Sequence, residues 1–152
     1  MTIAQVGWQL SEGARAMGSF LVMLQEAAKA CQVSAKKSMS LDYVGFMLNE
    51  GKYWIGLYFE EPQKLWFGTR CRIDLEAAAR LGEGTVESET WVPGGYQWCR
   101  AGELESEEVH FYHRSKVGQM QWLEKFLREC LEMARRVETP DQPPVPPQEA
   151  EE

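Results

Sequence analysis

The stretch from residue 42 to residue 71 constrains the fold more than any other part of the chain. It contains three runs rich in β-branched and aromatic residues, at 42–48, 52–60 and 64–71. The turn sequences NEGK and EPQ separate these runs. Because such short connections join antiparallel neighbours, the stretch predicts an antiparallel meander of three strands.

The first turn also contains the residue types of a nuclease metal site, Asp42, Glu50 and Lys52. With Glu50 in the turn, Leu48 lies opposite Tyr53 and the apolar side chains of both strands share one face. Glu50 then sits at the tip of the hairpin, and Asp42 is more than about 20 Å away at ~3.3 Å per residue. This geometry favours a solvated turn over a metal site.

The second hairpin extends the same pattern. With 61–63 as its loop, Phe59 pairs with Leu65 and Leu57 pairs with Phe67. The apolar face of the meander should therefore be the core of the sheet. The predicted core residues are Val44, Phe46, Leu48, Ile55, Leu57, Phe59, Leu65 and Phe67.

The opposite face of the meander combines aromatic residues with glycine. It carries Tyr43, Gly45, Met47, Trp54, Gly56, Tyr58, Trp66, Gly68 and Arg70. In this register Gly45 faces Gly56 and Gly56 faces Gly68, so that three glycines form a row. Glycine within a strand indicates a bend or a close approach by another group. Sheet curvature, a crossing helix and a binding groove all remain open as explanations.

Two long helices should flank the sheet. Apolar residues recur at spacings of three and four from Ile3 to Cys31 and again from Met120 to Val137. Ser115 is the expected N-cap of the second helix, and Thr139-Pro140 should end it. A short helix over 75–81 begins at the N-cap Asp74 and stops at Gly82.

The remaining segments complete the expected architecture. Residues 34–40 read as a loop, 85–92 and 96–100 as strands around a Pro-Gly-Gly turn, and 109–112 as an edge strand. We therefore predict an α+β fold with an antiparallel sheet of about five or six strands, two long helices and one short helix. A single domain over 1–138 precedes a disordered, proline-rich, acidic tail over 139–152.

Charge and cysteine content limit the classes of function. The net charge is −7, and residues 138–152 carry −5 of it, which leaves a body near −2 without a broad basic field for duplex nucleic acid. The cysteines Cys31, Cys71, Cys99 and Cys130 are too scattered for a zinc motif and predict free thiols. We see no signal peptide and no apolar run of ~20 residues, and expect a cytoplasmic protein without membrane partners.

Other candidate sites have ordinary alternatives. His110 and His113 beside Glu107 and Glu108 could bind a metal only on a helix, because on a strand they point to opposite faces. Trp91, Tyr96 and Trp98 surround the Pro-Gly-Gly turn, where they either stabilise the hairpin or contact a partner. The acidic run at 103–108 is either a solvated face or a surface that attracts a basic partner. The PPVPP segment of the tail is either a solubilising end or a docking peptide.

The sequence favours a non-enzymatic protein-interaction or accessory subunit of a cytosolic complex. One version of this hypothesis is a homo-oligomer formed through the helical stripes, by which we mean the apolar residues that recur along the two predicted long helices. The alternative is a single-stranded nucleic-acid-binding module that stacks bases on Trp54, Tyr58 and Trp66. A third hypothesis is a small-ligand binder or enzyme that uses the groove over Gly45, Gly56 and Gly68. We expect no catalytic residue, metal ligand or cofactor, and the candidate binding residues are Tyr43, Trp54, Gly56, Tyr58, Trp66, Gly68, Arg70, Trp91, Tyr96 and Trp98.

Overall fold

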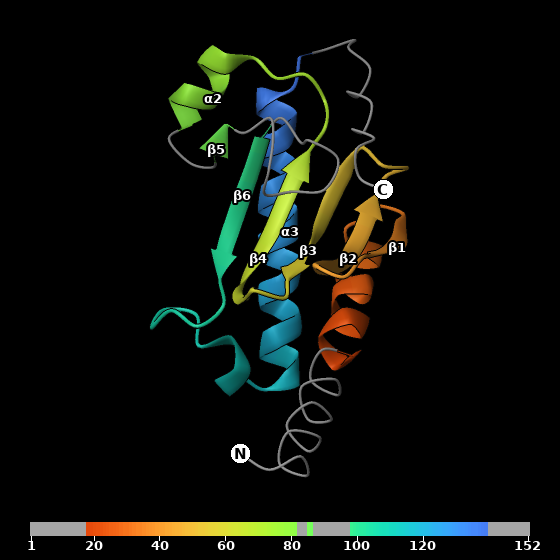
Figure 1. Cartoon of the computed structure of the whole chain (residues 1–152). Coiled ribbons are helices and arrows are strands. Elements are labelled where there is room, and N and C mark those ends of the chain that lie inside the picture. The colour runs from red at the N-terminus through yellow and green to blue at the C-terminus, as the bar shows by residue number, and fades with distance from the viewer. Residues whose placement is uncertain (1–17, 82–84, 87–97, 140–152) are drawn as a thin grey trace.

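The chain folds around one six-stranded antiparallel sheet (Figure 1). The computed structural model describes residues 18–81, 85–86 and 98–139. Its strands lie in the order β1-β2-β3-β4-β6-β5. The elements are a helix over 18–30, β1 (Ala35–Met39), β2 (Tyr43–Leu48), β3 (Tyr53–Tyr58), β4 (Glu61–Thr69), α2 (Leu75–Leu81), β5 (Thr85–Val86), β6 (Trp98–Glu103), the 3₁₀ helix η1 (Phe111–His113) and α3 (Lys116–Val137). This is the α+β class that the sequence predicts.

Some predictions lie outside the described residues. They are the first part of the N-terminal helix over 3–17, the stop of α2 at Gly82, the strand residues 87–92 and 96–97, and the tail from 140 onward. The helix over 18–30 confirms the apolar periodicity for the part that is described. It ends because Gln32 adopts a left-handed conformation (φ 63°) and Val33 N–H donates to the carbonyl of Ala28, which satisfies the last turn.

The first hairpin has the predicted register. Leu48 pairs with Tyr53, Val44 with Leu57 and Gly45 with Gly56. Two other predictions of local structure are wrong. Residues 35–39 form the edge strand β1 instead of a loop, and residues 111–113 form the 3₁₀ helix η1 instead of a strand. The sequence of β1 shows no alternation of apolar and polar residues, so it did not predict a strand. The reason is that β1 is an edge strand, where lysines such as Lys36 and Lys37 stay in solvent.

The second hairpin is shifted by two residues from the prediction. Phe67 pairs with Ile55 instead of Leu57, and a β-bulge lies between Gly56 and Tyr58. The shift arises because β4 begins at Glu61, within the expected loop, so that the turn falls at 59–60. A shift of two keeps every side chain on its predicted face. Phe59, however, moves into the turn and is 43% exposed, so its assignment to the core was wrong.

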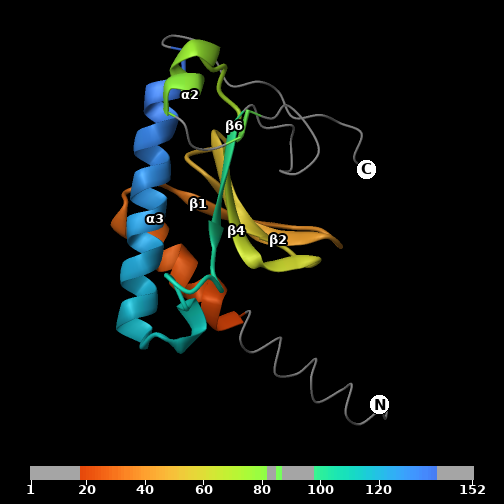
Figure 2. The same cartoon turned by 90° about the vertical axis from the view of Figure 1, so that its left-hand side faces the viewer.

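Both long helices cover the same face of the sheet (Figure 2). The parts of their apolar stripes that lie within 18–30 and 120–137 are buried there together with sheet residues that the alternation predicts. The shared core includes Phe20, Leu24, Ala27, Phe46, Leu48, Ile55, Leu57, Leu65, Phe67, Leu123, Leu127, Cys130, Ala134 and Val137. These parts of the stripes are therefore used for packing within the chain.

The two ends of α3 are held by separate sets of bonds. At its start, the Ser115 side chain accepts a hydrogen bond from Gly118 N at 3.1 Å, as predicted for an N-cap. At its end, the amide of Asp74 donates to the carbonyl of Val137 at 2.6 Å, and Thr139 N donates to Arg72 O at 2.8 Å. Asp74 also caps α2, as predicted. The helix is consequently fixed to the segment that leaves β4.

The burial of the α3 stripe predicts a large difference between two truncations in the same helix. Leu127 is fully buried and Val117 is 67% exposed. We expect Leu127→Ala to lower the free energy of unfolding by about 2–5 kcal/mol. The matched control Val117→Ala should change it by less than about 0.5 kcal/mol. Urea denaturation measures both, and a Leu127→Ala protein of unchanged stability would contradict this packing.

Candidate functional site

The predicted aromatic residues do come together on the sheet face opposite the helices. Trp54, Trp66 and Cys99 form a second buried cluster on that face. Tyr43 lies edge-on to Trp54, with ring centroids 5.7 Å apart, and Tyr58 packs on the same ring. Trp54 has no exposed surface and Trp66 is 9% exposed. Unpaired bases could stack on these two rings only if the cluster opened.

The glycines of this face make room for the protein's own groups. A Cβ built at Gly56 would lie 2.6 Å from Cζ2 of Trp54, so the indole occupies the space above Gly56. A Cβ at Gly45 would collide with the backbone of Ile55. The expected three-glycine row does not form, because Gly68 pairs with Trp54 and Gly56 pairs with Trp66. The glycine pattern therefore reflects close packing between neighbouring strands and the indole.

Other candidate residues are distributed over the molecule. Arg70 donates from Nε to the carbonyl of Gly51 at 2.8 Å and thereby holds the β2–β3 turn, where Gly51 has a positive φ of 89°. Trp98 lies on the helix-covered face, fully buried, with its ring 6.4 Å from that of Phe67. Trp91 and Tyr96 lie outside the described residues.

No candidate metal centre occurs in the described residues. The rings of His110 and His113 are 5.7 Å apart in the turn that leads into η1. Among the side chains in 18–81, 85–86 and 98–139, no group of three or more His, Cys, Asp and Glu residues could hold a metal ion. Cys31, Cys71, Cys99 and Cys130 are free cysteines, as the sequence predicts. Within this same part of the chain, no helix is long and apolar enough to cross a membrane.

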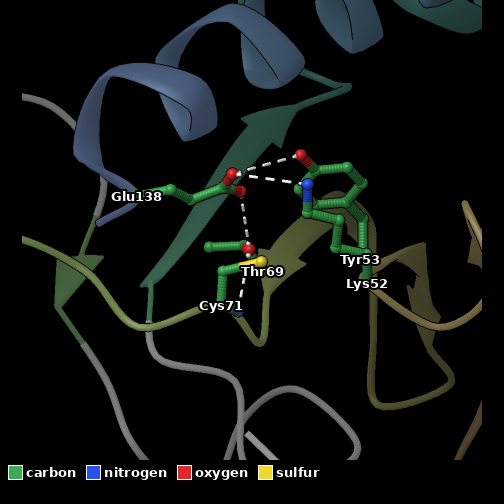
Figure 3. A network of polar contacts seen from close by, with 5 residues as sticks. All are labelled: Lys52, Tyr53, Thr69, Cys71 and Glu138. Carbon is green, nitrogen blue, oxygen red and sulfur yellow. Dashed lines mark hydrogen bonds and ion pairs between the residues drawn. The ribbon is translucent and has the colours of Figure 1, made fainter. Parts of the chain in front are cut away.

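A polar network that the sequence analysis missed connects the end of α3 to the sheet (Figure 3). Its centre is the Glu138 carboxylate, which accepts a hydrogen bond from Thr69 Oγ1 at 3.0 Å and a long one from the Tyr53 hydroxyl at 3.5 Å. Lys52 Nζ lies 3.8 Å from the same carboxylate. The buried Thr69 hydroxyl also accepts from the amide of Cys71 at 3.2 Å. Together these bonds tie the C-terminus of the helix to β3 and β4.

The Glu138 carboxylate acts on two neighbouring ionisable groups in this network. Burial, followed by the negative charge of Glu138, raises the pKa of the Tyr53 phenol. Burial and the same carboxylate also raise the pKa of the Cys71 thiol. A nucleophilic cysteine needs a lowered pKa, because the thiolate is the reactive form. Cys71 is therefore poorly suited to act as a nucleophile, and we call this network the clamp after the contacts that join the end of α3 to the sheet.

The open edge of β6 is the feature that the described structure leaves available. Leu104 N donates to Gln63 O at 2.7 Å, so Leu104 is a residue of β6 whose backbone bonds to β4. This bond shows which residues of β6 face β4 and which face away from it. In an antiparallel pair, every second residue turns its N–H and C=O away from the partner strand. Ala101 and Glu103 therefore direct their backbone groups outward. Within the described chain, β5 pairs only with Cys99 and Trp98 of β6.

A groove of about 370 Å³ lies beside this edge, between β6 and α3. Gly102, Trp122 and Phe126 supply much of its apolar lining, and the two rings stack with centroids 5.2 Å apart. Charged groups surround this lining. They are Arg100, Glu103, Glu108, Lys125 and Glu129. We call this feature the β6–α3 groove.

The groove depends on a close approach of the helix to the strand. A Cβ built at Gly102 would lie 2.7 Å from Cε1 of Phe126 and 3.0 Å from Cη2 of Trp122. Arg100 lies over the ring of Phe126 at 5.3 Å and pairs with Glu129 at 3.5 Å. These contacts hold one wall of the groove in place.

The sequence contained only a partial signal for this site. In the sequence, Phe126 widens the apolar stripe of the last helix, Trp122 carries no signal, and the acidic run at 103–108 is either a solvated face or a surface that attracts a basic partner. The comparisons add no relative, since no family model, curated protein or solved structure matches the chain.

The clamp predicts how Tyr53 titrates. Its raised pKa means that the folded state holds the phenol proton more tightly than the unfolded chain. This contribution to stability is complete below about pH 10, the ordinary tyrosine pKa, and is lost as the pH rises above it. We expect Glu138→Gln to lower the Tyr53 pKa toward, but not to, its ordinary value, because burial remains.

The measurement is an NMR titration of ¹³C-labelled tyrosine, with Tyr53→Phe identifying the signal. Glu132→Gln is the matched control, since Glu132 is an exposed glutamate on the same helix. An unchanged Tyr53 titration in Glu138→Gln would show that the carboxylate does not act on the phenol.

Proposed function

We propose that the chain is a non-enzymatic protein-interaction module, an accessory subunit whose partner binds in the β6–α3 groove. The observation that carries this proposal is the outer edge of β6 at Ala101 and Glu103, where no other described strand pairs and which lies directly beside an apolar lining. Open strand edges are sites where another chain can pair. The cytoplasm remains our proposed location, because free thiols such as the four cysteines are typical of reducing compartments.

Two alternatives receive less support. Nucleic-acid binding through Trp54 and Trp66 would require exposing rings that are buried. A small-ligand site over Gly56 would require displacing the Trp54 indole. Self-association through the parts of the helical stripes that lie within 18–30 and 120–137 would require opening the core.

The function is tested by affinity purification of three tagged proteins from lysate of the chain's own host. They are the wild-type chain, Ala101→Pro and Ala101→Ser. Proline removes the outward N–H of residue 101 and is tolerated at strand edges, whereas serine keeps the N–H. We expect a stoichiometric protein that survives nuclease treatment to be retained by the wild type and by Ala101→Ser. Its recovery with Ala101→Pro should fall at least tenfold.

Thermal denaturation of the three proteins checks that the two variants are folded. A partner retained equally by Ala101→Pro would place the interaction elsewhere on the molecule. Recovery of nucleic acid in place of a protein, or of no companion at all, would contradict the proposal.

A further inference from the structure

We infer that the partner contributes an extended, basic peptide segment that pairs with β6 as an added strand and places side chains in the β6–α3 groove. This inference rests on the proposed function and specifies the chemistry of its partner. It follows from the backbone of β6, the shape of the groove and the charge around it.

The backbone of β6 specifies an extended occupant. The outward N–H and C=O groups of Ala101 and the outward N–H of Glu103 are spaced for pairing with a strand, since residues two apart repeat along a ladder. The carbonyl of Glu103 already accepts a hydrogen bond from Ser106 Oγ at 3.4 Å. A helix could not satisfy these groups, because its own backbone groups are already bonded to one another. Thr85 pairs with Cys99, which lies two residues before Ala101 on the same edge of β6, so this edge already accepts a strand there.

The groove favours a peptide in which every second side chain is apolar or aromatic. A strand beside Ala101 and Glu103 would turn every second side chain toward α3. There it would meet Trp122 and Phe126, with Lys125 and Glu129 at the rim. Apolar or aromatic residues at alternate positions would fill this space, which is of the size that buries one small ligand or a few side chains.

The acidic segment 103–108 beside the groove favours a basic occupant, because its four carboxylates outnumber Arg100 and Lys125, the cations that line the groove. Glu105, Glu107 and Glu108 are exposed and form no ion pair with another described residue. Among the described residues, Glu103 forms an ion pair with Lys64 alone, at 3.7 Å, and its side chain is 54% exposed. The nearby Arg114 uses its guanidinium to bind the carbonyls of Val109 and Glu108. Lysine or arginine on the partner would complement these carboxylates.

The other edge of the sheet is less suited to the same partner. β1 carries Lys36 and Lys37, and lysines on an edge strand discourage pairing. They would also repel a basic segment.

Two other occupants fit less well. A second copy of the chain would bring its own acidic 103–108 segment against the first, and like charges oppose such pairing. The chain's own segment from 140 to 152 is acidic and contains five prolines, which lack the N–H that a strand must donate. Both are outcomes that the experiment can detect.

The experiment begins with a phage library of random 12-residue peptides selected on the full-length protein. We expect enrichment of sequences in which β-branched or aromatic residues alternate with polar ones, with lysine or arginine present and no central proline. The best synthetic peptide is then measured by fluorescence anisotropy against the wild type and the variants. Raising the salt from 50 to 300 mM should weaken binding several-fold, as charge complementarity requires.

The variants separate the backbone contribution from the charge contribution. Ala101→Pro should weaken binding at least tenfold and Ala101→Ser less than twofold. Glu105→Lys combined with Glu108→Lys should weaken it at least fivefold. The control Glu26→Lys reverses an exposed charge on the N-terminal helix and should leave the affinity unchanged.

Backbone methylation of the peptide keeps the test valid even if Ala101→Pro does not fold. Two peptides carry N-methyl groups on alternate residues, one on the odd and one on the even positions. In an added strand, only every second residue directs its N–H toward β6. Methylating those residues should abolish binding, whereas methylating the other set should leave it intact. Equal binding of both patterns would overturn the inference.

The remaining outcomes distinguish this inference from the proposed function. Enrichment of helical, proline-rich or acidic peptides would overturn the inference, and so would a dimer by light scattering that Ala101→Pro dissociates. Tighter peptide binding after truncation at residue 139 would identify the tail as a competitor and also count against it. If no peptide is enriched while the wild type retains a protein that Ala101→Pro releases, the proposed function stands and the extended-strand inference fails. If neither a peptide nor a protein binds, both fail.

Discussion

The contact between α3 and β6 at Gly102 is the constraint on which the candidate site depends. Phe126 and Trp122 approach the strand so closely that any side chain at residue 102 would collide with them. This approach places the two rings against β6 and creates one wall of the groove. The far end of the helix is held independently by Glu138, so its position over the sheet is determined at both ends.

Different groups bury the side chains on the two faces of the sheet. On one face, two helices cover aliphatic side chains, which is the usual layered arrangement. On the other face, Trp54 lies over Gly56 and packs against Tyr43 and Tyr58, so aromatic residues bury one another. The abundance of aromatic residues on this face therefore follows from packing. Glycine is needed there because the indole takes the space of a side chain.

Much of the fold could be predicted because its signals are local. The alternation in β2 and β3 specified their register, and Ser115 and Asp74 specified the starts of two helices. The second hairpin was misplaced because a shift of two residues leaves the same side chains on the same faces, so the hydrophobic pattern could not detect it.

The candidate site was less predictable because it depends on distant parts of the chain. The groove requires β6 beside β4 and α3 across one face of the sheet, and among the described residues β5 pairs only with Trp98 and Cys99 of β6. None of these relations leaves a pattern within one segment. The clamp was missed for the same reason, since Glu138 and Tyr53 are 85 residues apart and meet only in the fold. Glu138 had been counted only as a charge of the acidic end.

Residue-resolved amide hydrogen exchange along β6 tests the central claim most directly. In the free protein, the amides of Arg100 and Gly102 face β4 and should exchange slowly, whereas those of Ala101 and Glu103 face outward and should exchange quickly. Saturation with a bound partner segment should slow exchange at Ala101 and Glu103 and leave the other two amides unchanged. Protection of Ala101 and Glu103 already in the free protein, or their continued rapid exchange in the saturated complex, would contradict the account.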